Sequence, residues 1–230
     1  MKRMLLLLSI LLFGFSSFCQ PHFLKRLQQG KPQHIVVYGT SLSSGGNGRA
    51  WMQVVSEGIQ QYYGENLIRY SLAGKGGMWS TWGVKNFEDS VVAKKPDAVF
   101  IEFGINDAFL DYATPVELAK LNLEYMIDRV MLYSDSCDIF LQVMNMPIGK
   151  SAALRPDLDA YYTMYREVAR DKKVLLIDHY TNWLAILKKG ENIFRQYVPD
   201  GLHPNAKGAK EVIAPKILEV LNVEYVTEIK

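Results

Sequence analysis

The chain has 230 residues, of which 49% are hydrophobic and 22% are charged, so it is long enough to form one substantial globular core. Its 26 Lys and Arg residues nearly balance its 24 Asp and Glu residues, which leaves a formal net charge of +2. So small a charge excludes the strong positive field by which proteins gather nucleic acid, and we expect no nucleic-acid partner.

The N-terminal residues have the pattern of a secretory signal peptide. Two basic residues precede an apolar run over residues 5–15, and this run is shorter than the roughly 20 residues that span a bilayer. We therefore expect residues 1–19 to be removed after Cys19, with export to the periplasm or the extracellular space and no stable membrane insertion. A lipid anchor on Cys19 is the alternative, but Phe18 stands where lipoprotein signals have a small residue.

The remainder is interpreted as one domain. Cleavage would leave Cys137 without a cysteine partner in the same chain, so we expect it to be a small buried hydrophobic residue rather than half of a disulfide. Residues 20–33 are polar and have little periodicity, and we interpret them as a lead-in to a catalytic domain over residues 34–230. The oligomeric state is left open.

Five apolar runs of strand length alternate with longer amphipathic segments. Each run is rich in Val, Ile, Leu, Phe or Tyr and is bounded by turn residues. The predicted strands cover residues 34–38, 66–72, 97–103, 138–144 and 173–178. Their near-continuous hydrophobicity predicts burial on both faces, as in a parallel sheet.

Helices are predicted between and after these strands, over residues 50–63, 81–93, 115–133, 157–171 and 181–188. Thr114, Pro115 and Glu117 are typical of a helix start. A last helix is predicted over residues 205–221, where Pro215 should kink it or shift its register. The alternation predicts an α/β fold, a three-layer α/β/α sandwich around a flavodoxin-like, doubly wound parallel sheet of about five strands.

Polar residues follow the predicted strands at their carboxyl ends, where doubly wound sheets bind ligands. They are Ser41 after the first strand, a glycine-rich turn over residues 72–80 after the second, Asn106 after the third, and Asp200 and His203 near the end of the chain. We therefore expect a single site at this edge of the sheet.

The histidines offer a choice of general base. A serine hydroxyl becomes a good nucleophile when a neighbouring base takes its proton, and imidazole is the usual base because its pKa lies near neutrality. His22 lies in the lead-in, and His34 begins a strand at the opposite edge. His179 follows the fifth strand, but adjacent strand residues point to opposite faces. Asp200 stands three residues before His203, a spacing that allows its carboxylate to orient the ring, so we favour His203.

These residues resemble the SGNH, or GDSL-type, hydrolases. The first block of that family, most often Gly-Asp-Ser-Leu, is similar to residues 39–42. The third block, Gly-x-Asn-Asp, is similar to residues 104–107, and the last, Asp-x-x-His-Pro, to residues 200–204. Order and spacing agree over residues 34 to about 221. Thr40 stands where the family most often has Asp; that Asp is not a triad member, and we expect the change to affect loop geometry and pH dependence.

The second block of the family fits with one exception. The family usually shows Asn-x-Gly-x-Gly-Gly followed three residues later by Ser, and residues 72–77 with Ser80 fit this pattern except that Leu72 replaces Asn. In this register Gly77 is the functional glycine, whereas a shifted register would select Gly74. A glycine suits this place because it allows the backbone to approach a substrate closely.

The resemblance implies a serine esterase that acts through an acyl-enzyme without a metal or an organic cofactor. Ser41 would attack the ester, His203 would transfer the proton, and Asp200 would orient the ring. The oxyanion hole would consist of the backbone N–H groups of Ser41 and Gly77 and the side-chain amide of Asn106. Loss of one such donor typically costs about 2.7 to 4 kcal/mol of transition-state stabilisation.

The substrate is predicted less directly. Compact size and expected export favour removal of O-acetyl groups from a polysaccharide or another glycan, and a lipase, lysophospholipase or thioesterase of the same fold is the alternative. Trp79 and Trp82 lie near the predicted edge in sequence and are candidates to bind a sugar or an acyl chain, although aromatics at helical spacing more often fill a core. A glycan-binding protein without turnover is the alternative of another class; the full set of Ser, Asn, Asp and His argues against it.

Overall fold

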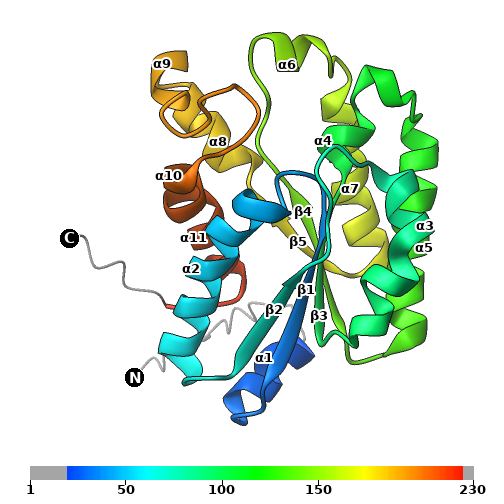
Figure 1. The fold of residues 1–230 in the computed structure, drawn as a ribbon, viewed down its shortest axis with the longest axis vertical. Helices are drawn as coiled ribbons and strands as arrows, with labels where there is room; N and C mark the ends of the chain where they lie inside the picture. The colour runs from blue at the N-terminus through cyan, green and yellow to red at the C-terminus, as the bar shows by residue number, and fades with distance from the viewer. Residues whose placement is uncertain (1–19, 225–230) are drawn as a thin grey trace, which may run out of the picture.

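The computed structural model describes residues 20–224, so the expected signal peptide lies outside the described residues. A five-stranded parallel sheet with the order β2-β1-β3-β4-β5 forms the middle layer (Figure 1). The strands are β1 (Gln33–Gly39), β2 (Ile68–Leu72), β3 (Ala98–Glu102), β4 (Asp138–Val143) and β5 (Leu175–Asp178). All five predicted strands are present, and the predicted doubly wound α/β fold is confirmed.

Helices cover both faces of the sheet (Figure 1). Helices α2 (Gly45–Tyr63) and α11 (Ala214–Val220) pack together over one face, and α3 (Ser80–Ser90), α5 (Val116–Tyr133) and α7 (Leu158–Lys172) cover the other. The remaining helical elements are α1 (His22–Gln28), η1 (Val92–Lys94), α4 (Gly104–Asp107), η2 (Leu110–Tyr112), α6 (Lys150–Ala153), α8 (Tyr180–Leu187), α9 (Glu191–Phe194), α10 (Ala206–Gly208) and η3 (Ala209–Ile213). Within residues 20–224, no helix combines the length and the apolar character that crossing a bilayer requires.

The core lies on both sides of the sheet because helices cover both faces. Central strand residues such as Val36, Phe100 and Phe140 are fully buried. At the carboxyl end of β1, Gly39 pairs in register with Glu102 of β3. A Cβ atom on Gly39 would lie 2.3 Å from the Glu102 carbonyl oxygen, so only glycine allows this approach. The residue that follows β1 is thereby held against β3.

The lead-in differs from the expectation, because residues 20–33 contain helix α1. Three apolar side chains of this helix, Phe23, Leu24 and Leu27, are buried in the same core as the strands. They recur at helical spacing, but three residues in a polar segment are too few to give a clear periodic signal. The packed domain therefore includes residues before 34.

Helix α2 begins at Gly45, five residues before its predicted start. Glycine disfavours helix by roughly 1 kcal/mol per residue relative to alanine, which is why the sequence predicted a loop. Trp51 is fully buried in this helix and donates its ring N–H to the Leu42 carbonyl at 3.1 Å. Tertiary packing thus fixes a helical turn that local propensity opposes, and the loop between β1 and α2 is short.

Prolines shape two other helices. The last predicted helix is interrupted by a π-helical segment, Ala209–Ile213, directly before α11, which carries Pro215 in its first turn. Proline lacks an N–H and clashes with the carbonyl four residues earlier, so a wider turn accommodates it. At the start of α5, Pro115 is the N-cap, and the Thr114 hydroxyl donates to the Tyr112 carbonyl at 3.3 Å instead of capping the helix.

Candidate active site

The carboxyl edge of the sheet brings the predicted serine, histidine and aspartate together. Ser41 lies just beyond β1, and Asp200 and His203 lie in the loop between α9 and α10. Ser41 Oγ is 2.9 Å from His203 Nε2, and His203 Nδ1 is 2.7 Å from Asp200 Oδ2. A hydroxyl, an imidazole and a carboxylate therefore form one continuous hydrogen-bonded chain.

The carboxylate of Asp200 is also held by the backbone. Its Oδ1 accepts hydrogen bonds from the N–H groups of Leu202 at 2.9 Å and His203 at 2.7 Å. Partial burial raises the pKa of Asp200, but these N–H groups and the His203 ring outweigh it, and the net pKa is lowered. An ionised Asp200 favours the tautomer with the proton on Nδ1, which leaves Nε2 free to accept a proton from the serine.

The alternative base, His179, lies outside this arrangement. It is fully buried, its Nε2 is 3.2 Å from Gln142 Oε1, and burial lowers its pKa to about 3. His34 forms its two ring hydrogen bonds near the other end of the sheet. The structure thus places His203, and not His179, against Ser41.

The glycine-rich segment forms a tight turn over residues 75–78, beside the serine. A backbone hydrogen bond of 3.2 Å joins its last N–H to its first carbonyl, and Gly77 has a φ of +74°. A type II turn requires a positive φ at this third position, where glycine is favoured. A Cβ atom on Gly76 would lie only 3.6 Å from the Cβ atom of Ser41, so the turn lies directly against the serine.

Close packing, and not an unpaired N–H group, distinguishes Gly74 from Gly77. Within residues 20–224, the N–H groups of Ser41 and Gly77 have no hydrogen-bond acceptor. A Cβ atom on Gly74 would lie 2.4 Å from the carbonyl oxygen of Gly39, so close packing against β1 explains that glycine. Free donors beside a nucleophile are the elements from which an oxyanion hole is built.

Two hydrogen bonds orient the side chain of Asn106, which lies in α4 and is buried. Its Nδ2 donates to the Met78 carbonyl at 2.8 Å, and its Oδ1 accepts from Arg155 Nη2 at 3.4 Å. The first bond joins Asn106 to the residue after Gly77. An amide nitrogen has two hydrogens, so one remains available for a substrate oxygen.

Arg155 is a residue of this site that the sequence analysis did not identify. Its buried guanidinium donates to the carbonyls of Ile105 at 2.7 Å and Ser151 at 3.1 Å, and lies 4.9 Å from the centre of the Phe109 ring. Burial lowers its pKa, but arginine stays charged in proteins. Arg155 therefore places a positive charge beside the Asn106 amide. It is distant in sequence from the family blocks, so no local pattern signals it.

The two candidate tryptophans have different surroundings. Trp82 is partly buried and packs against the core residue Tyr38, with 5.7 Å between ring centres. Trp79 is partly exposed and stacks on Tyr112, with 4.4 Å between ring centres and 15° between ring planes. The Tyr112 hydroxyl donates to the carbonyl of Gly77. Trp79 is thus the tryptophan associated with the glycine turn.

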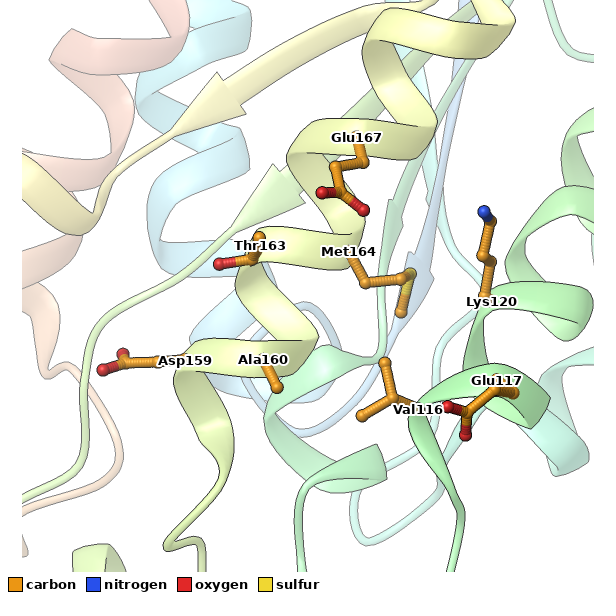
Figure 2. A pocket seen from close by; sticks show the side chains of 8 residues that line it. All are labelled: Val116, Glu117, Lys120, Asp159, Ala160, Thr163, Met164 and Glu167. Atoms are coloured by element: carbon orange, nitrogen blue, oxygen red, sulfur yellow. The ribbon is translucent and has the colours of Figure 1, made fainter.

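A groove of about 430 Å³ lies apart from these residues, between α5 and α7 (Figure 2). Its lining consists of Val116, Glu117, Lys120, Asp159, Ala160, Thr163, Met164 and Glu167. Figure 2 shows Met164 of α7 and Val116 of α5 facing each other across it. The groove includes none of the predicted site residues. In the described part of the chain, no group of three or more His, Cys, Asp or Glu side chains is placed to hold a metal ion.

The fold and the geometry of this edge point to one class of protein. Residues 37–211 match the model of the GDSL-like Lipase/Acylhydrolase family. The chain belongs to this family and is a carboxylic ester hydrolase, which confirms the resemblance inferred from the sequence blocks. A search of curated proteins finds no match.

Solved structures share the fold at low sequence identity. A protein from Parabacteroides merdae described as a GDSL-like lipase has a TM-score of 0.74 and 17% identity, covering 84% of this chain and 97% of its own. An acetylxylan esterase from Geobacillus stearothermophilus has a TM-score of 0.72 and 21% identity, covering 87% and 99%. An α/β hydrolase enzyme from the metagenome of Lake Arreo, Spain, has a TM-score of 0.70 and 20% identity, covering 84% and 96%.

Proposed function

We propose that this chain is an exported serine esterase that removes O-acetyl groups from a polysaccharide or another glycan. The observation that carries the catalytic part is the hydrogen-bonded chain from Ser41 Oγ to His203 and on to Asp200, with distances of 2.9 and 2.7 Å. Ester hydrolysis as such follows from family membership. The identity of the residues, the acyl group and the export are the proposal.

Acylation begins when Ser41 Oγ attacks the ester carbonyl carbon and His203 Nε2 takes the hydroxyl proton. The carbonyl π bond opens, and its electron pair stays on the oxygen as an oxyanion. When the tetrahedral intermediate collapses, the bond to the alcohol oxygen breaks, and His203 gives its proton to the departing alcohol. Asp200 stays ionised and stabilises the imidazolium between the two transfers.

Deacylation repeats these steps with water as the nucleophile. His203 takes a proton from water as the water oxygen attacks the acyl-enzyme, and a second tetrahedral oxyanion forms. Its collapse releases the carboxylic acid, and Ser41 regains its proton from His203. The chemistry balances with ester and water as the reactants and needs no redox partner.

The oxyanion of both intermediates would be bound by the unpaired N–H groups of Ser41 and Gly77 and by the Asn106 amide. The Met78 carbonyl and the Arg155 guanidinium hold that amide from its two ends. Donors fixed in this way need little rearrangement when negative charge develops, which is the main source of their effect.

The glycan part of the proposal is supported by two observations. One of the similar structures is an acetylxylan esterase. In this chain, Trp79 is partly exposed and is braced by Tyr112 next to the glycine turn, and aromatic faces of this kind pack well against sugar rings. Trp82 is also partly buried, but its ring packs against Tyr38 of the core, so it is the weaker candidate.

A lipase activity is the second candidate, because the matching family includes lipases and one similar structure is described as a GDSL-like lipase. Rates on p-nitrophenyl acetate and p-nitrophenyl octanoate separate the two. The deacetylase proposal expects faster turnover of acetate and release of acetate from acetylated xylan. A strong preference for octanoate would contradict it.

The catalytic assignment is tested by comparing Ser41→Ala with the wild type on p-nitrophenyl acetate. Ser136→Ala is a suitable control, because Ser136 accepts a hydrogen bond from Arg26 near the other end of the sheet. We expect loss of turnover in Ser41→Ala alone, and equal rates in all three proteins would overturn the mechanism. Export is tested by the N-terminal sequence of the protein recovered outside the cytoplasm, which should begin at Gln20.

A further inference from the structure

Thr40, immediately before the candidate nucleophile, is fully buried against a carboxyl group of β3. Its hydroxyl donates to Glu102 Oε2 at 2.8 Å, and its backbone N–H lies 3.2 Å from the same oxygen. The Ser43 hydroxyl also donates to Glu102 Oε2, at 3.2 Å. The N–H of Leu42 in turn donates to the Thr40 hydroxyl oxygen at 3.2 Å.

These bonds enclose Ser41 from both sides. One carboxyl oxygen holds the residue before the serine and the residue two positions after it, and the Thr40 hydroxyl holds the residue directly after it. All the groups involved except Ser41 itself are buried, so water does not compete for them. A carboxyl group from a neighbouring strand thus holds the backbone on both sides of Ser41, and the side-chain amide of Asn47 donates to the Ser41 carbonyl itself at 3.0 Å.

We propose that Glu102 of β3 is a positioning residue for Ser41 and acts through its hydrogen bonds to Thr40 and Ser43. This inference rests on the proposed role of Ser41 as the nucleophile. Thr40 and Glu102 then act together, because the threonine hydroxyl accepts a hydrogen bond from Leu42 and donates one to the Glu102 carboxyl group.

The surroundings explain why threonine suits position 40 in this chain. The titratable groups that face Glu102 are Asp107, Tyr162 and Tyr165, and none of them is a cation. An aspartate at position 40 would add a second carboxyl group to a buried site that has no cation to neutralise it. Threonine instead donates a hydrogen bond to Glu102 and accepts one from Leu42.

Burial favours the protonated form of Glu102. Burial raises its pKa to about 8, even though the bonds from Thr40 and Ser43 act in the opposite direction. The charge of Asp107 raises the pKa further. A neutral carboxyl group still accepts hydrogen bonds at Oε2, so glutamine at this position preserves the acceptor and never ionises.

The test combines Thr40→Val, Glu102→Leu and the double variant, assayed on p-nitrophenyl acetate. Each single variant should lower kcat by about tenfold to a hundredfold with KM nearly unchanged, because a misplaced nucleophile slows the chemical step. Because the two residues act as one unit, the double variant should lose little more kcat than either single variant.

Thermal unfolding of the same variants separates positioning from general stability. Each single variant leaves a buried polar group without its partner, which lowers Tm, whereas an apolar pair of similar shape in the double variant should recover part of the loss. Recovery of Tm without recovery of kcat is the expected result. Parallel recovery of both would show that Glu102 supports only the fold.

Glu102→Gln gives a readout that does not depend on a large loss of stability. We expect kcat close to that of the wild type at neutral pH. In the wild type, kcat should fall above pH 8, because ionised Glu102 places a negative charge against the segment that carries Ser41, and Glu102→Gln should remove this fall. An unchanged alkaline profile in Glu102→Gln would contradict the proposal.

Ser71→Ala is the matched control, since it removes a hydroxyl that bonds the buried His34 ring away from the serine loop. It should lower stability without lowering kcat. If Thr40→Val and Glu102→Gln both behave as the wild type in kcat and in pH profile while Ser41→Ala is inactive, the positioning role is wrong and the proposed function stands. If Ser41→Ala is fully active, the proposed function fails first.

Discussion

The carboxyl groups at the two ends of the parallel sheet differ in whether they have hydrogen-bond donors. At the amino end, Asp97 accepts hydrogen bonds from Arg26 at 2.8 Å and from the backbone of His34 at 2.8 Å. Asp138 accepts one from the backbone N–H of Phe23 at 2.6 Å. Helix α1 supplies two of these three donors, so the segment that reads as a lead-in donates to both carboxylates.

At the carboxyl end, donors and acceptors are left over. The N–H groups of Ser41 and Gly77 have no acceptor within residues 20–224, and one oxygen each of Glu102 and Asp107 is buried without a hydrogen-bond partner there. Unsatisfied buried groups cost stability, typically about 1 to 3 kcal/mol each. The carboxylates of Asp97 and Asp138 at the amino end thus have donors, whereas buried oxygens of Glu102 and Asp107 at the carboxyl end do not. The free N–H groups at the carboxyl end lie beside Ser41, the proposed nucleophile.

The largest expected difference between the two ends comes from replacing a histidine at each. His203→Ala should lower kcat on p-nitrophenyl acetate by on the order of 10⁴-fold or more, because the serine loses its base. His34→Ala removes a buried ring with two hydrogen bonds and should lower Tm while leaving kcat of the folded protein intact. A large loss of kcat in His34→Ala would contradict the prediction that the histidine at the amino end supports stability alone.

The next effect concerns the oxyanion hole. Asn106→Ala should lower kcat by about 10²- to 10³-fold with little change in KM, because the amide acts on charge that develops only in the transition state. Asn122→Ala is its control, since Asn122 is also buried but bonds to the hydroxyls of Ser80 and Thr81 at the start of α3. Similar kcat losses in both variants would indicate a structural role for Asn106.

The buried carboxyl groups of Glu102 and Asp107 predict that stability depends on pH. Burial raises the pKa of Glu102 from 4.5 to about 8 and that of Asp107 from 3.8 to about 7. Between the ordinary and the raised values, the folded protein keeps a proton that the unfolded chain has released. The free energy of unfolding should therefore fall as pH rises through this window.

Urea unfolding at pH values from 5 to 8 measures this fall. Glu102→Gln should flatten the curve, and Asp107→Asn should flatten it further. If the wild-type protein became more stable over the whole interval, Glu102 and Asp107 would ionise without lowering stability. The proposed difference in stability between the two ends would then be wrong.

The smallest effect is expected at the amino end. Arg26→Met removes a partly exposed pair with Asp97 and a hydrogen bond to Ser136, and should lower the free energy of unfolding by about 1 kcal/mol. Because α1 lies at the opposite end from Ser41, kcat should not change. Loss of activity at unchanged stability would show that the two ends are coupled.

The strands and the residues of the family sequence blocks could be predicted from the sequence because their signals are local. Apolar runs of strand length mark β1 to β5, and the order of strands and helices places Ser41 and Asn106 at one edge. The helical turn at Gly45 was missed, because it depends on packing around Trp51 rather than on propensity. Asp200 and His203 were found as a pair because their spacing is itself local.

The residues that support the site were missed for a different reason. Glu102 meets Thr40 only because β1 and β3 pair with Gly39 opposite Glu102, and this register cannot be read from either strand alone. Arg155 reaches Asn106 from 49 residues away in sequence. Supporting contacts of this kind arise from tertiary structure, and neither residue belongs to a recognisable pattern.

The hydrogen bond between Ser41 and His203 spans 162 residues of sequence. Bringing two residues so far apart in sequence into contact costs chain entropy, and local contacts do not offset this cost. The Ser41–His203 bond can therefore form only when most of the domain has already packed. During synthesis the strand before Ser41, the proposed nucleophile, is made long before the loop that carries His203, its proposed base. In a nascent or partly refolded chain, Ser41 therefore has no base beside it. Hydrolysis should begin only when the loop that carries His203 has packed against the folded sheet.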